Sequence, residues 1–270
     1  MNRDKVYIYD GSYEGILCAI GRALEEKENV VGVFREGEQS LLYFGEVIEI
    51  PSNKDKAKKI AQFLREKLGD YGVTFLYYGN LAEGETVPFS LYEYIFFGLN
   101  QAGKNLAYSL TDPLVLKVLG FRQKVGKEYH RLLGLIRFRS LSSGILYAQV
   151  EPDHRVLGLL GSHFARRLPN ERWLIHDARR DWALIGESGK YRLIHLSADQ
   201  VPQEDMEDEI EKLWQLYHAH VAIRERFNEK TQKNFMPQRY WKHLVEKPGE
   251  AEGIQNNSYR RNKKNRLILD

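Results

Sequence analysis

The sequence predicts an α+β protein that has a central antiparallel sheet flanked by helices, preceded by a mixed α/β N-terminal part. Apolar residues recur at helical spacing over 13–26 and over most of 90–132. Over 136–139 and 145–150 apolar residues instead alternate with other residues, as in a strand, and helical spacing returns at 154–167. Short strand-like runs with close turns follow, which favours antiparallel pairing over a βαβ winding.

The N-terminal elements follow from local patterns. Residues 6–9 form a short β-rich run, and Asp10 or Ser12 could cap the helix that follows it. Residues 41–50 are strand-like, and a second helix begins at Asn53. These elements predict a mixed N-terminal part without a repeated unit.

The C-terminal half alternates between short strands and helices. Residues 173–177, 182–185 and 191–196 are predicted strands, and 187–190 is a hairpin turn between the last two. A long helix is predicted over 205–227, where acidic residues begin the helix and basic residues end it, as the helix dipole favours.

Three parts are expected along the chain. Residues 1–88 form the N-terminal part, 89–247 form an α+β core domain, and 248–270 form a flexible basic tail. Pro237 begins a last short helix before this tail. Within this helix, Tyr240, Trp241 and Leu244 are expected to dock into the core.

Charge is distributed unevenly along the chain, although 40 basic residues nearly balance 37 acidic ones. Residues 121–180 carry 12 basic and 5 acidic residues, and residues 221–270 carry 12 and 6. Such blocks attract polyanions, and nucleic acid is favoured over a membrane because no basic amphipathic anchor is evident. Locally basic helix faces and tails are the alternative explanation.

Composition and motifs exclude several classes of protein. Cys18, the single cysteine, excludes a disulfide framework and a cysteine-based zinc or iron–sulfur site within one chain, and it indicates a reducing, cytoplasmic location. No apolar run spans a membrane and no secretory signal is evident. The local signatures of P-loop, Rossmann, zincin and α/β-hydrolase proteins are absent, and the eight histidines lack a metal-ligand pattern. No cofactor or metal is therefore expected.

Two histidines and one aspartate are the candidates for chemistry. His154 and His163 lie at the two ends of one predicted helix, and either could transfer protons together with Asp177. The alternative is that these side chains are hydrogen-bonded structural residues. Similarly, the segment 177–180 could present two arginines to an anion, or Asp177 could form a structural ion pair with an arginine.

Nine cationic residues are the candidates for nucleic-acid binding, and we expect them to converge on one groove. Arg137 and Arg139 occupy alternate positions on one predicted strand, which places them about 6.6–6.8 Å apart, close to the spacing of neighbouring phosphates. Others flank aromatic residues in the segment 236–244, where rings could stack on bases. The candidates are Arg131, Arg137, Arg139, Arg166, Arg167, Arg179, Arg180, Arg239 and Lys242.

An ordered set of segments resembles a known family. YIYDGSYEGILCAI, HRLLGLIRF, EPDH, GSHFARR, RWLIHDARR, IRERFN and FMPQRYWKHL occur in this order. Together they resemble the DUF4130 family of bacterial DNA-metabolism or DNA-repair proteins, over residues 5–247 and most strongly over 90–247. Members accompany a DNA-repair radical SAM protein, and a similar domain is fused to uracil-DNA-glycosylase-like proteins.

The resemblance implies a DNA-binding accessory protein that acts with a radical SAM iron–sulfur enzyme. Because this chain has one cysteine, the cluster would belong to the partner. One alternative is a DNA-processing enzyme, a hydrolase or a glycosylase-like protein, that uses His163 or His154 with Asp177. Another is a protein–protein scaffold that binds no nucleic acid.

Overall fold

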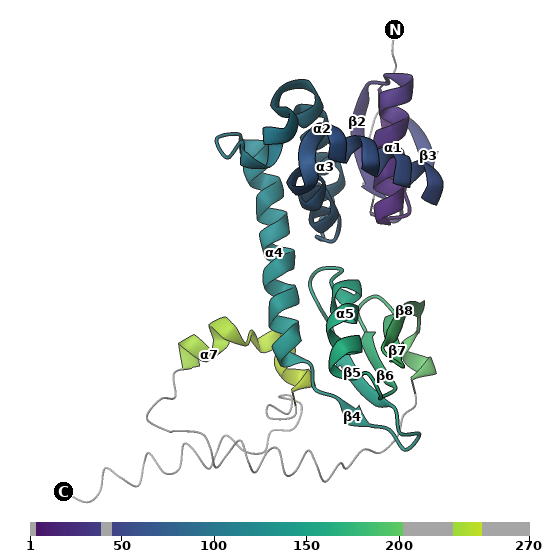
Figure 1. The fold of residues 1–270 in the computed structure, drawn as a ribbon, viewed down its shortest axis with the longest axis vertical. Helices are drawn as coiled ribbons and strands as arrows, with labels where there is room; N and C mark the ends of the chain where they lie inside the picture. Colours follow the sequence, from purple (N-terminus) through teal and green to yellow (C-terminus); the bar gives the residue numbers. More distant parts are fainter. Residues whose placement is uncertain (1–3, 39–44, 202–228, 245–270) are drawn as a thin grey trace, which may run out of the picture. The chain divides into compact units, whose positions relative to one another are not determined.

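The computed structural model describes residues 4–38, 45–201 and 229–244. The expected α+β class is confirmed, with one parallel three-stranded sheet and one mixed five-stranded sheet (Figure 1). The chain forms two compact units, of which the first comprises 1–129 with 153–156 and the second the remainder. The helix expected at 205–227 and the tail at 248–270 lie outside the described residues. The predicted boundary after residue 88 stays a prediction.

The sheet of the first unit has β1 at its centre. The strands β1 (Lys5–Tyr9), β2 (Val30–Arg35) and β3 (Glu46–Ile50) are parallel, in the order β2-β1-β3. Val6, Tyr7 and Tyr9 are buried, as expected of a central strand. Strand β2 was not among the elements expected from the sequence.

Two capped helices follow β1 and β3. The helix α1 (Tyr13–Glu26) has Ser12 as its N-cap, whose hydroxyl accepts a hydrogen bond from the Gly15 amide at 2.9 Å. The helix α2 (Lys54–Asn80) has Asn53 as its N-cap and accommodates a left-handed residue, Gly69, with φ of 76°. Both expected helix starts are confirmed.

The helical region after residue 86 is broken twice before residue 113. The helix α3 (Val87–Phe97) leads into a π turn, η1 (Gly98–Ala102), and a 3-10 helix, η2 (Gly103–Tyr108). The helix α4 (Pro113–Leu135) then begins after Asp112, whose carboxylate accepts a hydrogen bond from the Leu114 amide at 2.8 Å. This contact caps the first turn.

The second unit is built on five strands in sequential order. They are β4 (Arg139–Ser140), β5 (Leu146–Val150), β6 (Trp173–Asp177), β7 (Trp182–Glu187) and β8 (Lys190–His195). The expected hairpin turn joins β7 to β8, and Ser188 and Gly189 both have positive φ there.

One strand pair departs from the expected antiparallel arrangement. Strands β5 and β6 are parallel, whereas β4–β5, β6–β7 and β7–β8 are antiparallel. The reason is the helix α5 (Leu157–Arg167), which carries the chain from the end of β5 back to the start of β6. The sheet is therefore mixed and contains one βαβ unit.

The helix α5 begins at Leu157, three residues later than expected. The preceding backbone is held in a loop, because the Glu128 carboxylate accepts hydrogen bonds from the amides of Asp153 at 2.8 Å and His154 at 2.7 Å. The Arg155 amide donates to the carbonyl of Leu81 at 2.9 Å. These amides are therefore not available for a helical turn.

The core of the second unit lies between α5 and one face of the sheet. Phe164 of α5 contacts Trp173 of β6 with ring centroids 6.1 Å apart. The Trp173 ring packs directly against Gly186 of β7, where a side chain would collide with it. Tyr191 of β8 packs in the same way against Gly161 of α5. Both glycines thus permit close packing.

The last described segment docks as expected. It comprises the helix α7 (Glu229–Phe235) and a 3-10 helix, η5 (Gln238–His243). Tyr240 and Leu244 are buried, and the Trp241 indole donates to the carbonyl of Met236 at 2.8 Å. No helix in the described part of the chain is long and apolar enough to cross a membrane.

Candidate nucleic-acid interface

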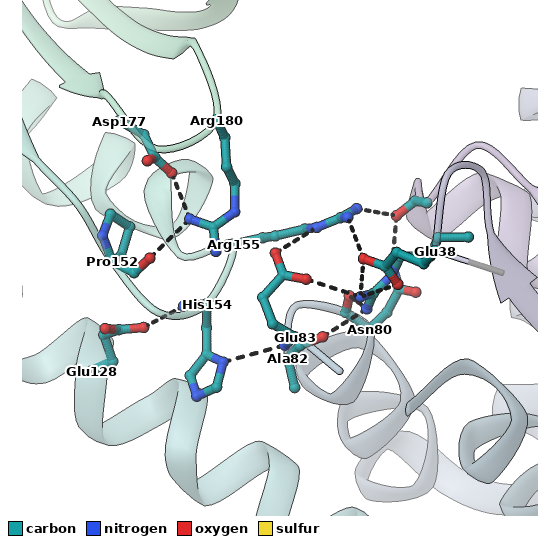
Figure 2. A network of polar contacts seen from close by, with 12 residues as sticks. Glu38, Asn80, Ala82, Glu83, Glu128, Pro152, His154, Arg155, Asp177 and Arg180 are labelled. Carbon is teal, nitrogen blue, oxygen red and sulfur yellow. Dashed lines mark hydrogen bonds and ion pairs between the residues drawn. The ribbon is translucent and has the colours of Figure 1, made fainter. Parts of the chain in front are cut away.

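The turn between β6 and β7 is held by a buried carboxylate. Asp177 is 1% exposed, and one of its oxygens lies 2.9 Å from the guanidinium of Arg180. The other oxygen accepts a hydrogen bond from the Arg179 amide at 3.1 Å. Arg180 also donates to the carbonyl of Pro152 at 2.9 Å (Figure 2). The structural Asp–Arg pair is therefore present, and it fixes the conformation of the turn.

The electrostatics of Asp177 reflect two opposing effects. Burial of the carboxylate raises its pKa, and the charge and hydrogen bond of Arg180 lower it, with burial the larger effect. The pKa of Asp177 therefore lies above its ordinary value. A buried carboxylate that is held by an arginine and a backbone amide fixes the conformation of the turn.

An exposed aromatic pair lies directly after this turn. Trp182 is 45% exposed and is paired across the sheet with His195, with ring centroids 5.7 Å apart. His195 is exposed, and so is Arg179 within the turn. The region next to the β6–β7 turn therefore combines an exposed indole, an exposed imidazole and the exposed Arg179. Aromatic faces stack on bases, and guanidinium groups bind phosphates.

The other described candidates are spread over the second unit. Arg137 donates to the Gly134 carbonyl at 2.7 Å, and Arg139 lies opposite Tyr147 in the β4–β5 pair. Arg131 donates to the Asn234 carbonyl at 3.3 Å. Arg131 and Arg137 are thus bonded to backbone carbonyls, and all three arginines are half-buried.

Strand β6 separates two of the arginine pairs. Arg166 and Arg167 end the helix α5, which returns the chain to the start of β6, whereas Arg179 and Arg180 follow the end of β6. The two pairs therefore lie toward opposite ends of strand β6. Convergence of all nine residues on one groove stays a prediction. The last two candidates, Arg239 and Lys242, lie in η5, and their side chains are outside the described part of the structure.

His154, a candidate acid or base, has a defined partner. Its Nδ1 atom accepts a hydrogen bond from the Glu83 amide at 3.3 Å, so this nitrogen is unprotonated (Figure 2). Burial lowers its pKa, although the neighbouring carboxylates, of which Glu128 acts most strongly, oppose that shift. His154 therefore stays neutral to a lower pH than an exposed histidine.

His163 and His176 occupy different environments on the second unit. The His163 ring contacts Phe164 edge-to-face at 4.9 Å, and its buried Nε2 has no hydrogen-bond partner within the described ranges. His176, which the sequence analysis did not select, is 1% exposed and lies between the Tyr147 hydroxyl and the Leu196 carbonyl, each at 3.1 Å. An acid–base role for His154 or His163 with Asp177 stays a prediction.

A second cluster that the sequence did not indicate lies in the first unit (Figure 2). Arg35 is 1% exposed and donates to the carbonyls of Asn80 at 2.9 Å and Ala82 at 2.7 Å. Its guanidinium also contacts Glu83 at 3.2 Å and Glu38 at 3.4 Å. Because charged groups are rarely buried unpaired, this network explains how an arginine ends a core strand.

Arg155 brings the loop before α5 into the same network. Its Nε atom lies 3.1 Å from Glu83, and its Nη2 atom lies 3.4 Å from Glu38. The Gly11 carbonyl accepts a third hydrogen bond from Arg155 at 3.3 Å. Within the described residues, no group of three or more histidine, cysteine, aspartate or glutamate side chains could hold a metal ion. The network therefore consists of ion pairs between arginines and carboxylates within the first unit.

Comparison with known proteins places the chain in a family. The family model DUF4130, described as a domain of unknown function, matches residues 85–246. The chain therefore belongs to the DUF4130 family, and that family's description assigns it no activity. No curated protein and no solved structure matches this chain.

Proposed function

We propose that this DUF4130 protein is a nucleic-acid-binding protein of DNA metabolism that acts as an accessory to a radical SAM enzyme. The observation that supports binding best is the exposed pair of Trp182 and His195 beside the Arg179–Arg180 turn. Exposed aromatic rings next to cationic side chains are the combination on which single-stranded nucleic acids stack. The segment resemblance stated above supports DNA as the nucleic acid.

Two interactions would contribute to the free energy of binding, base stacking and phosphate contacts. Stacking of a base on an aromatic side chain contributes about 1–3 kcal/mol and tolerates any sequence. Contacts between guanidinium groups and phosphates add a term that depends on salt but carries no sequence information. Trp182 supplies the first term and Arg179 the second. Arg180 acts mainly by holding the turn, since its guanidinium is paired with Asp177.

Fluorescence anisotropy with labelled single- and double-stranded oligonucleotides tests this proposal. Trp182→Ala should weaken binding to single strands by about tenfold, since it removes a stacking surface of about 1–3 kcal/mol. The matched control is Arg192→Ala, which removes an exposed charge from β8 of the same sheet and should weaken binding less. Arg179→Ala is preferred over a double variant with Arg180, because loss of Arg180 leaves the Asp177 charge buried.

Two outcomes would replace the proposal. A folded protein that fails to bind any oligonucleotide at low salt would favour the scaffold alternative. A protein that alone converts damaged oligonucleotides into cleaved products on a denaturing gel would favour the enzyme alternative with His154, His163 and Asp177.

The radical SAM partner is tested separately. The family resemblance supports this partner, and Cys18 is buried in α1 with its Sγ atom 3.4 Å from the Asn53 amide. We expect the chain to co-elute with a purified radical SAM protein together with iron and acid-labile sulfide. Co-elution should persist with Cys18→Ala, because the cluster belongs to the partner. Separate elution of the two proteins would contradict this part of the proposal.

A further inference from the structure

A cavity lies between α2 and α4. Its volume is about 270 Å³, and all of its lining residues belong to the first unit. One comes from α2 and the other five come from α4. They are Tyr78, Arg122, Gln123, Gly126, Lys127 and Tyr129. The lining therefore contains two aromatic rings, two cations and no acidic residue.

Arg122 is held at this cavity by aromatic rings. The central carbon of its guanidinium lies 5.4 Å from the centroid of Phe75 and 6.0 Å from that of Tyr78. Among the described residues its buried Nε atom has no hydrogen-bond partner. This nitrogen has no exposed surface, so a ligand would meet the rest of the guanidinium, which brings positive charge to the lining of the cavity.

The shape and the chemistry of the lining select the class of anion. Tyr78 and Tyr129 contribute aromatic rings to the lining, and Gln123 contributes an amide that can both donate and accept hydrogen bonds. Arg122 and Lys127 offer positive charge for a phosphate. At about 270 Å³ the cavity is slightly smaller than the usual ligand pocket of about 300–1,000 Å³, which restricts it to a small ligand such as a single nucleotide.

We propose that this cavity binds a nucleoside monophosphate unit, with the base against the tyrosine rings and the phosphate at Arg122 and Lys127. The choice of a nucleotide rests on the proposed function. The same chemistry could come from a free nucleotide or from the 5′-phosphorylated end of a DNA strand. The cavity would then recognise a nucleotide end, a role separate from the stacking of a base on Trp182.

Gly126 offers a way to block the cavity without disturbing the fold. A Cβ atom added at Gly126 meets no atom within 4 Å, and Gly126 lines the cavity. Gly120 on the same helix has equally open space but is not part of the lining. Replacement of either helical glycine should favour the helix, since glycine costs about 1 kcal/mol relative to alanine there. Gly126→Leu is therefore the blocking variant and Gly120→Leu is its matched control.

Isothermal titration calorimetry with 2′-deoxyadenosine 5′-monophosphate tests the site. We expect saturable binding that Gly126→Leu weakens at least about tenfold and that Gly120→Leu leaves unchanged. Arg122→Met keeps an apolar side chain beside Phe75 and Tyr78 but removes the charge, and it should also weaken binding about tenfold or more. Deoxyadenosine and inorganic phosphate should each bind more weakly than the nucleotide. Equal binding by the wild type and Gly126→Leu, or absence of binding by the folded wild type to both the nucleotide and a 5′-phosphorylated strand, would overturn the proposal.

Oligonucleotides with and without a 5′-phosphate distinguish the two sources and separate this proposal from the function. Preference for the 5′-phosphorylated strand that Gly126→Leu abolishes would identify a strand end as the ligand. Binding of the free nucleotide without such a preference would identify a free nucleotide. If strands bind through Trp182 but neither the 5′-phosphate nor Gly126→Leu matters, the cavity proposal fails and the proposed function stands. If the nucleotide binds in a manner sensitive to Gly126→Leu but no strand binds, the proposed function fails and the cavity remains a free-nucleotide site.

Discussion

The Nη1 atom of Arg35 lies 3.2 Å from a carboxylate oxygen of Glu83, and the other oxygen of Glu83 lies 3.1 Å from the Nε atom of Arg155. One carboxylate thus joins the end of β2 to the loop that precedes α5. Since Arg35 is 1% exposed, its charge depends on this contact, on Glu38 and on two backbone carbonyls. Segments far apart in the sequence are thereby tied within the first unit.

Glu83→Gln should lower the free energy of unfolding by about 2 kcal/mol, because a hydrogen bond to a charged group contributes about 1.5–3 kcal/mol. The effect is limited because Glu38 and the carbonyls still contact Arg35. Urea denaturation measures it, and Glu85→Gln, on an exposed residue two positions away, is the control. Equal stability of the two variants would show that the Glu83 contacts contribute nothing.

His154 should make stability depend on pH. Burial lowers its pKa, whereas Glu128, Asp153 and Glu83 oppose that shift and Lys124 adds to it. Because the native pKa lies below the ordinary value of about 6.5, the unfolded state binds more protons between these two values. The free energy of unfolding should therefore fall as the pH drops below about 6.5.

His154→Asn isolates this effect, because the asparagine oxygen can replace Nδ1 as an acceptor but takes up no proton. Urea midpoints at pH 7.5 and pH 5.5 should differ less in this variant than in the wild type. The control is His130→Asn at an exposed position. If the wild type and His154→Asn lost the same stability on going from pH 7.5 to pH 5.5, this explanation would be refuted.

Asp177→Asn should lower the free energy of unfolding by about 3 kcal/mol, because it leaves the paired Arg180 charge without its carboxylate in a largely buried position. Asp181→Asn makes the same chemical change in the same turn, where φ is 54° and asparagine is well tolerated. Thermal unfolding of both variants measures the difference. Loss of stability in Asp181→Asn alone would contradict the structural role of Asp177.

Gly186→Ala should lower the free energy of unfolding by about 2–3 kcal/mol. An added Cβ would lie 1.9 Å from Cε2 of Trp173, so the sheet or the indole must move. Gly120→Ala, in open space on α4, should instead raise stability by up to about 1 kcal/mol. Calorimetric unfolding that shifts both variants in the same direction would contradict this packing.

Local patterns predicted the helices better than the strand pairing. Ser12 and Asn53 cap their helices as the sequence indicates, since capping depends on neighbouring residues alone. Strand β2 was missed because its pattern includes Gly32 and ends in the charged Arg35. The parallel β5–β6 pair depends on the crossover by α5, a rule that requires knowing that both strands share one sheet.

For the candidate sites too, the sequence predicted a contact between neighbouring residues but missed contacts between distant segments. The Asp177–Arg180 pair was one of two readings of a four-residue segment, and the structure confirms it. The Arg35 network escaped prediction because Glu83 and Arg155 are 48 and 120 residues away along the chain. The exposure of Trp182 similarly depends on the place of β7 in the sheet and on the pairing with His195, which no local pattern encodes.

The salt dependence of binding to a labelled single strand tests the central claim most directly. The logarithm of the association constant should fall linearly with the logarithm of salt concentration, with a slope of about −0.7 for each phosphate contact. Arg179→Ala should make this slope shallower by about 0.7, whereas Trp182→Ala should lower affinity without changing the slope. Binding that is independent of salt, or that neither variant alters, would contradict the account.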